Sequence, residues 1–287
     1  MTRAPLVTRG GDACPVCRAR TTRAIDVGSF ALHRCPDCGA WSSDALARGA
    51  ATSFEPERYF ENAGLERASW EKLFARLARA GLHPRSALDV GCGTGEFLAF
   101  LAAQGAVRRE GIELDAARAV RARRRDPPAR VHAGDAQAML EQVEGPFDLI
   151  TLWDVFEHVP DPTSLLTALS QRLAPGGALY VQTIHEHSAV PALGRLAYRL
   201  SGGRLRGPAR RTHEAHHAVF FTRASLERAA LLAGLRIEAL WWGRLARARM
   251  DGPAWLTALT SLLLRAENAL GGGLFVNALM RHADARR

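Results

Sequence analysis

The chain has 287 residues, which is long enough for one full α/β domain and a small appendage. Hydrophobic residues make up 47% of it and charged residues 23%, a globular composition that excludes an intrinsically disordered chain. The net charge of +9 favours anionic partners, such as nucleic acid, phosphorylated substrates or an acidic membrane surface, over neutral ones.

Neither end of the chain predicts a membrane segment. The N-terminal residues hold no apolar run of the length that a secretory leader needs. The most apolar stretch, from Pro253 to Met280, is interrupted by Arg265, Glu267 and Asn268, so no membrane span is expected. We therefore expect a cytoplasmic protein whose cysteines are reduced.

Two Cys-x-x-Cys pairs, seventeen residues apart, lie near the N-terminus. Four thiolates at this spacing suit a tetrahedral Zn²⁺ ion and leave no position for water, so we expect a structural zinc rather than a catalytic one. Two disulfides or redox-active thiols are the alternatives. Short strands are predicted at 25–27 and 30–32, which makes residues 1–48 a zinc ribbon. The predicted metal ligands are Cys14, Cys17, Cys35 and Cys38.

A helix and a glycine-rich turn follow the ribbon. Apolar residues at helical spacing between 70 and 80 predict an amphipathic helix, which makes residues 49–85 a helical segment before the sheet. An apolar strand at 87–90 then runs into a turn where glycines let the backbone approach a ligand closely. Within this turn Cys92 is interpreted as a small apolar filler, with a nucleophile as the alternative. The glycines are Gly91, Gly93 and Gly95.

The segment from Asp89 to Gly95 resembles the first signature of class I S-adenosylmethionine-dependent methyltransferases, and the resemblance extends over residues 86–182. It implies that Glu113 takes both ribose hydroxyls and that Asp135 meets the adenine amino group. A solvated charge and a helix cap are the respective alternatives. The implied cofactor-binding residues are Asp89, Gly91, Cys92, Gly93, Gly95, Glu113, Leu114, Asp135, Ala136 and Trp153.

The resemblance also implies the fold class. We expect an α/β protein with a Rossmann-like sheet of seven strands, the last one antiparallel, next to the small N-terminal zinc ribbon. The methyltransferase domain would span residues 86–287, with a lid insertion at about 188–215. Its sixth and seventh strands are predicted at 235–242 and 272–279. The helix predicted at 254–270 should dock on its own domain.

The segment after the predicted fourth strand borders the expected methyl-transfer site. It resembles the Glu-His-x-x-x-Pro element of ubiquinone-biosynthesis O-methyltransferases and related small-molecule enzymes. That resemblance implies an acid–base or substrate role for His158. It also raises a divalent-cation site at Asp154, Glu157 and His158, although an aspartate replaces the expected glutamate. Local hydrogen bonds at a helix start are the alternative.

Five more histidines follow the fifth strand. His216 or His217 is predicted to accept a proton, because neutral imidazole titrates near the working pH. The five together are predicted to contact substrate, with surface or gap-filling roles as the alternative for each. Six arginines between 189 and 211 suggest an anionic acceptor or a solvated face, in a lid hinged at glycines 202, 203 and 207. The five are His185, His187, His213, His216 and His217.

These patterns leave three function classes. The first is methyl transfer from S-adenosylmethionine to the oxygen or carbon of a small molecule in biosynthesis. The second is a tRNA or rRNA methyltransferase, suggested by the ribbon and the basic charge, although 153–156 lacks the Asn/Asp-Pro-Pro-aromatic element of many base methylases. The third is a dinucleotide-dependent oxidoreductase, which uses a similar glycine turn. Neither the acceptor molecule nor the oligomeric state follows from the sequence.

Overall fold

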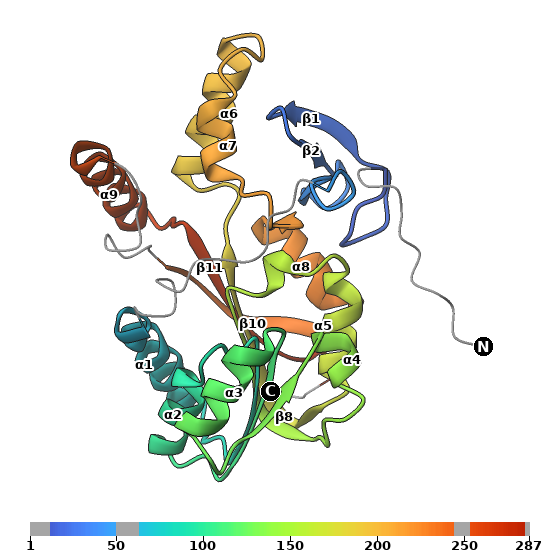
Figure 1. The fold of residues 1–287 in the computed structure, drawn as a ribbon, viewed down its shortest axis with the longest axis vertical. Helices are drawn as coiled ribbons and strands as arrows, with labels where there is room; N and C mark the ends of the chain where they lie inside the picture. Colours follow the sequence, from blue (N-terminus) through green and yellow to red (C-terminus); the bar gives the residue numbers. More distant parts are fainter. Residues whose placement is uncertain (1–11, 50–62, 244–252, 285–287) are drawn as a thin grey trace.

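The computed structural model describes residues 12–49, 63–243 and 253–284 (Figure 1). The N-terminal strands are β1 (Thr22–Asp26), β2 (Ala31–Arg34) and β3 (Trp41–Ser43). The helices are α1 (Ala63–Arg79), α2 (Glu96–Ala103), α3 (Ala116–Arg125), α4 (Ala136–Met139), the 3₁₀ helix η2 (Phe156–His158), α5 (Pro162–Ser170), α6 (Ala189–Leu200), α7 (Gly207–Thr212), α8 (Arg223–Leu232) and α9 (Ala254–Ala269). The remaining strands are β4 (Ser86–Val90), β5 (Arg108–Glu113), β6 (Arg130–Ala133), β7 (Phe147–Trp153), β8 (Leu173–Ile184), β9 (Val219–Phe220), β10 (Leu235–Gly243) and β11 (Phe275–His282).

The central sheet has seven strands in the order β10-β11-β8-β7-β4-β5-β6. β11 runs antiparallel to both of its neighbours, whereas β4, β5, β6, β7 and β8 pair in parallel. This confirms the predicted fold class, including the antiparallel last strand. Because the order reverses beside β4, the loops at the carboxyl ends of β4 and β7 flank a switch point, where open α/β sheets bind ligands.

Two apolar cores cover the two faces of this sheet. Along β4, Leu88 and Val90 join the core formed with α5 and α8, whereas Ala87 joins the core formed with α1, α2 and α3. This division follows from the alternation of side chains along a strand. Figure 1 shows α1, α2 and α3 on one side of the sheet and α4, α5 and α8 on the other.

The N-terminal ribbon does not close on itself. Its antiparallel sheet has the order β1-β2-β3-β9, and β9 comes from the distant segment 219–220. Trp41 pairs with Phe220 and Ser42 with Val219. The ribbon is therefore completed by a strand of the larger domain, which a boundary at residue 48 does not capture.

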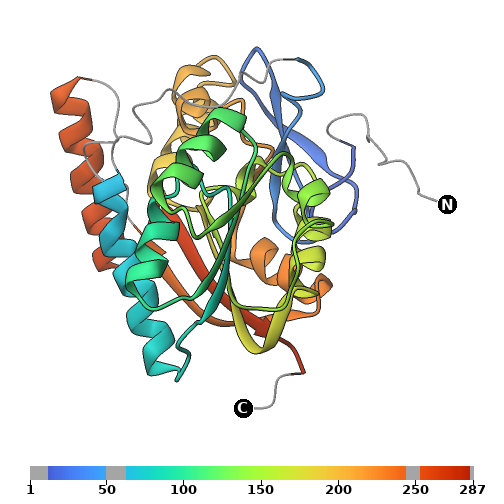
Figure 2. The ribbon, with the colours of Figure 1, turned by 60° about the horizontal axis from the view of Figure 1, so that its bottom comes forward.

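The insertion at 188–215 folds into a hairpin of α6 and α7 that packs on the ribbon. The hydroxyl of Tyr198 accepts the Asp26 N–H at 3.2 Å, and the Arg195 guanidinium lies 5.4 Å from the Trp41 ring centroid. Figure 2 shows the hairpin beside the ribbon. Glycines 202 and 203 have positive φ in the connecting turn, but Gly207 begins α7. The hinge role of these glycines stays a prediction, and contacts with the ribbon hold the insertion in place.

Helix α9 docks on its own domain, as predicted. The Glu267 carboxylate accepts the Ser188 hydroxyl at 2.8 Å and the Ala189 N–H at 3.1 Å, which ties α9 to the start of α6. Within residues 12–49, 63–243 and 253–284, no helix combines the length and apolarity needed to cross a bilayer.

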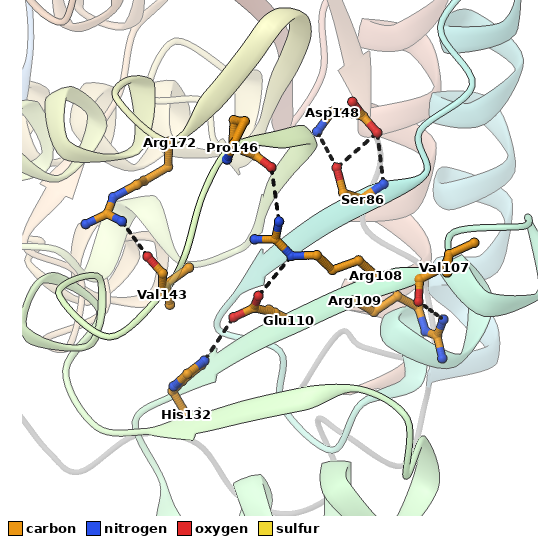
Figure 3. A network of polar contacts seen from close by, with 10 residues as sticks. All are labelled: Ser86, Val107, Arg108, Arg109, Glu110, His132, Val143, Pro146, Asp148 and Arg172. Carbon is orange, nitrogen blue, oxygen red and sulfur yellow. Dashed lines mark hydrogen bonds and ion pairs between the residues drawn. The ribbon is translucent and has the colours of Figure 1, made fainter.

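A polar network fixes the edge of the sheet opposite the carboxyl ends (Figure 3). The Asp148 carboxylate accepts the Ser86 hydroxyl and N–H at 3.0 and 2.9 Å, which pins β7 to the start of β4. Across β5 and β6, Glu110 accepts from Arg108 at 3.1 Å and lies 3.1 Å from His132. The strand register that positions the carboxyl-end loops is thus held by side chains as well as by the ladders.

Candidate active site

The glycine turn, residues 91–95, joins β4 to α2. Gly91, Gly93 and Gly95 have φ values of 75°, 55° and 85°, in the left-handed region that favours glycine. A Cβ on Gly91 would lie 2.3 Å from Val155 Cγ2, and one on Gly95 would lie 2.9 Å from the Ala122 Cα. Both glycines are therefore required by backbone conformation and by the close packing that shapes the turn.

Glu113 closes the turn from the end of β5. Its side chain is buried, and its two carboxylate oxygens accept the N–H groups of Gly93 at 2.8 Å and Asp115 at 2.9 Å. Each oxygen keeps a further lone pair, which suits two vicinal hydroxyl donors. Beside it Leu114 is 72% exposed, an apolar surface of the kind on which an adenine ring can lie. These residues fit S-adenosylmethionine.

Asp89 and Cys92 support the turn through contacts with the neighbouring strands β7 and β5. Asp89 is buried and accepts the Thr151 hydroxyl at 2.7 Å, so it braces β4 against β7. Burial, together with the Glu113 charge, raises the pKa of Asp89 to about 7. The Cys92 side chain packs at Gly111, and burial raises the pKa of its thiol, which supports the filler interpretation over the nucleophile.

The other predicted cofactor residues follow β6 and β7. Asp135 is exposed and caps α4, accepting the N–H groups of Gln137 and Ala138 at 3.0 and 3.2 Å. The helix-cap alternative therefore holds, and any adenine contact would use the rest of its carboxylate. Ala136 begins α4, and Trp153 ends β7 with its ring 4.4 Å from the Tyr180 ring centroid.

Two acidic side chains, Asp154 and Glu66, lie where β7 ends, and the sequence did not predict Glu66 as a site residue. Asp154 has φ 53°, an unusual conformation for a non-glycine residue, and accepts the Gln182 amide at 2.9 Å. Burial raises the pKa of Asp154 to about 6. Burial and the Asp154 charge raise the pKa of Glu66, on α1, to about 8. No local motif marks Glu66, because α1 is far from β7 in the chain.

The proposed cation site at Asp154, Glu157 and His158 is not formed. Glu157 is buried and accepts the Thr183 hydroxyl at 2.8 Å, while Asp154 bonds to Gln182. Burial raises the pKa of Glu157 to about 8. Within the described ranges, the sets close enough to share an ion are the four ribbon cysteines and three histidines, and neither contains Asp154 or Glu157.

Those three histidines, His158, His216 and His217, form the histidine cluster. Their ring centroids lie 4.5 to 5.1 Å apart. His158 ends η2 after β7, whereas His216 and His217 precede β9, so the fold unites all three predicted catalytic residues. Burial lowers the pKa of His158 to about 4 and that of His217 well below its ordinary value, so both are neutral at pH 7.

The five later histidines do not act as one group. His213 is buried and lies 3.0 Å from the carboxylate of Glu186, a wholly buried side chain that also pairs with Arg195. The His185 ring packs 4.5 Å from the ring of Trp242, and His187 is exposed. Of these five, only His216 and His217 join the histidine cluster, and contact with substrate stays a prediction.

The four ribbon cysteines converge as predicted. Their sulfur atoms all lie within 4.8 Å of one another, with Cys14–Cys38 and Cys17–Cys35 separations of 3.5 Å. These separations are too long for disulfides, so the disulfide alternative is not borne out. In each pair the residue after the second cysteine has positive φ, Arg18 in the first and Gly39 in the second. The thiols fit a tetrahedral metal.

One residue links the ribbon to the histidine cluster. The Ala218 N–H donates to the Glu157 carbonyl at 2.8 Å, and its carbonyl accepts the Ser43 N–H at 3.0 Å. Ala218 directly follows His217, and Glu157 directly precedes His158. The backbone that carries the cluster is thus held between η2 and strand β3 of the ribbon.

Comparison with known proteins agrees with this geometry. The methyltransferase domain family matches residues 59–240, well over half of the chain, and the chain therefore belongs to this family. It carries a methyltransferase domain.

Curated relatives match only part of the chain. The ubiquinone biosynthesis O-methyltransferase of Pseudomonas paraeruginosa is 35% identical over 113 residues, which cover 38% of this chain and 48% of that protein. The enzyme of the same name from Psychrobacter arcticus is 30% identical over 167 residues, or 55% and 62% of the two chains. The chain thus spans roughly half to two thirds of these relatives' lengths.

A solved structure shares the fold. The putative sarcosine dimethylglycine methyltransferase from Galdieria sulphuraria superposes with a TM-score of 0.51 at 17% identity, covering 82% of this chain and 95% of that one. At this identity the likeness concerns the fold alone.

Proposed function

We propose that this chain transfers the methyl group of S-adenosylmethionine to an oxygen or carbon of a small molecule. The observation that carries the proposal is the position of the histidine cluster. One member, His158, lies in the loop after β7, whose residue Val155 packs directly on Gly91 of the glycine turn. His216 and His217 contact His158 from the segment before β9. The names of the partial relatives, which are O-methyltransferases, support an oxygen acceptor.

The residues of the turn would hold the cofactor. Glu113 would take the ribose hydroxyls, Leu114 would lie along the adenine, and the amides at the start of α2 would face the remaining polar groups. When bound, the cofactor supplies a methyl group on a sulfonium leaving group. Transfer breaks the carbon–sulfur bond as the acceptor's bond to the methyl carbon forms, so positioning is the protein's main task.

The histidine cluster would receive the reactive group of the acceptor. A hydroxyl or acidic carbon must lose its proton as the new bond forms, and neutral imidazoles can assist that loss. His216 is the best placed of the three, because its Nε2 lies 2.9 Å from a carboxylate oxygen of Glu214, which orients the ring. Glu66 and Asp154 would border the same space from α1 and β7.

We further propose that the four ribbon cysteines hold a structural Zn²⁺ ion. Four thiols leave no coordination position open, so the metal would stabilise the ribbon and, through Ala218, the backbone of the histidine cluster. We propose a cytoplasmic location for the same reason, because a reducing compartment keeps the four thiols free to bind metal.

An RNA acceptor is the second candidate. The α6–α7 hairpin exposes five arginines, which suit either phosphates of RNA or an anionic small molecule. These are Arg199, Arg204, Arg206, Arg210 and Arg211.

A labelling experiment tests the proposal. The full chain is incubated with methyl-labelled cofactor and cell extract, which is then fractionated into small molecules, lipid, RNA and protein. We expect label in small molecules, and none with Glu113→Ala. Label confined to RNA, with binding that weakens steeply as salt rises, would replace the small-molecule proposal with the second candidate.

A further inference from the structure

Each member of the histidine cluster offers a ring nitrogen that lies within 4.8 Å of a ring nitrogen of the other two. A tetrahedral zinc ion with bonds of about 2.0–2.1 Å holds its nitrogen ligands about 3.4 Å apart. Movements of roughly 1 Å would therefore bring the three rings onto one ion. Three imidazoles with a fourth position open are a ligand set found in catalytic zinc sites.

Hydrogen bonds to oxygen acceptors fix two of the rings. His158 Nδ1 lies 3.2 Å from the carbonyl oxygen of His216, and His216 Nε2 lies 2.9 Å from a carboxylate oxygen of Glu214. Both partners are acceptors, so these two ring nitrogens can donate to them, and His158 also has a hydrogen bond to the Asp154 backbone. Metal-binding histidines are typically fixed in this way by a carbonyl or a carboxylate.

The third ring supplies an independent observation. His217 is 5% exposed, and its Nδ1 is a buried nitrogen without a hydrogen-bond partner in the part of the chain that the structure describes. A buried polar atom left unpaired is costly and calls for a specific explanation. A cation coordinated by this nitrogen would satisfy it.

The backbone under the cluster is held in place before any ion binds. Ala218 is hydrogen-bonded to Glu157 on one side and to Ser43 on the other, which fixes the strand that carries His216 and His217 against the end of η2. A site built on such a supported backbone needs little rearrangement.

We propose that His158, His216 and His217 bind one divalent transition-metal ion of the zinc type, separate from the four-cysteine site. Imidazole ligands favour zinc, cobalt or nickel over magnesium, which prefers oxygen ligands. With the ion bound, the imidazoles would act as ligands and not as proton acceptors: the fourth position would accept the acceptor's hydroxyl oxygen and lower its pKa, and the proton would pass to water. Metal binding itself does not depend on the proposed function; only the identity of this fourth ligand rests on it.

Cobalt titration of the full chain, stripped of metal by chelation, tests the site. Wild type should bind two equivalents of Co²⁺, of which only one gives a thiolate-to-cobalt charge-transfer band. His216→Ala and His217→Ala should each bind one equivalent and keep that band. The exposed His187→Ala is the matched control and should keep two.

Two further variants complete the experiment. Glu214→Gln should keep both equivalents but weaken the one without a charge-transfer band about 10- to 100-fold, as loss of a supporting carboxylate does. Cys35→Ser should lose the band, while the histidine-dependent equivalent persists with weaker affinity, because Ser43 of the ribbon supports Ala218. A single equivalent in wild type, or two equivalents in both histidine variants, would overturn the site.

The same preparations are titrated with S-adenosylhomocysteine. Two metal equivalents without binding of this nucleoside would contradict the proposed function and leave the metal site standing. Nucleoside binding with only one metal equivalent would contradict the metal site and leave the proposed function standing.

Discussion

The two sides of the candidate active site are built differently. The cofactor side is one continuous segment, from Asp89 to Asp115, in which backbone amides and a buried carboxylate face each other across β4 and β5. The acceptor side is assembled from two distant segments whose backbones meet at Ala218 and are supported by the ribbon. Because the two sides are built from different segments, we expect a substitution on one side to impair either cofactor binding or methyl transfer and to leave the other unchanged.

Removing one ring of the histidine cluster should separate the two sides most sharply. We expect His216→Ala to lower kcat about 100- to 10,000-fold, the range for loss of assisted proton transfer. The Kd for S-adenosylhomocysteine, measured by calorimetry, should stay within about threefold, because the glycine turn is untouched. An equal fall in kcat and in nucleoside affinity would show that the histidine cluster also contributes to cofactor binding, against the separation of the two sides.

Disrupting the ribbon should have the next largest effect. Cys35→Ser should lose the structural zinc and lower kcat about 100-fold, because misplacing the backbone around Ala218 by about 1 Å displaces two histidines. Elemental analysis counts the metal, and circular dichroism checks that the larger domain remains folded. Cys92→Ser, outside the ribbon, should keep its full metal content. Unchanged turnover in zinc-free Cys35→Ser would show that the ribbon does not support the site.

On the cofactor side, Glu113→Ala should weaken nucleoside binding by about 1–3 kcal/mol, the cost of leaving hydrogen-bonding groups unpaired. Calorimetry measures this directly, and Asp135→Ala, an exposed helix cap, is the comparison. If Glu113→Ala bound as tightly as wild type, the ribose contact would be misassigned.

The last expected effect concerns the pH dependence of stability and not binding or turnover. Burial raises the pKa of Asp89 from 3.8 to about 7, so the folded state holds a proton that the unfolded state releases. This contribution to stability is fully present below about pH 4 and is lost as pH rises through 7, at up to about 1.4 kcal/mol per unit. Asp89→Asn should flatten the dependence in urea titrations at pH 5 and pH 8. If the unfolding free energy of Asp89→Asn changed with pH as it does in wild type, a group other than Asp89 would cause the pH dependence.

The comparison also explains what could be predicted from the sequence. The sheet, the glycine turn and the four cysteines were predictable because each motif is local, and conformational needs such as positive φ at Gly91 and Gly95 select a residue type. Arg18, at the same conformation in the first cysteine turn, carried no such signal.

Long-range assembly was not predictable. Nothing near residue 219 indicates that it pairs with Trp41 and Ser42, and the spacing between His158 and His216 says nothing of their contact. Glu66 gave no signal, because its environment comes from Asp154 and Gln182 on other elements. The metal set implied by resemblance failed because Glu157 turns into the core toward Thr183.

The most direct test of the account is a crystal structure of the full chain with S-adenosylhomocysteine. The account predicts the nucleoside over residues 91–95, with its ribose hydroxyls on Glu113 and its adenine along Leu114. Its sulfur should point toward the loop that carries His158. A nucleoside bound elsewhere, or a turn closed against it at saturating concentration, would contradict the account.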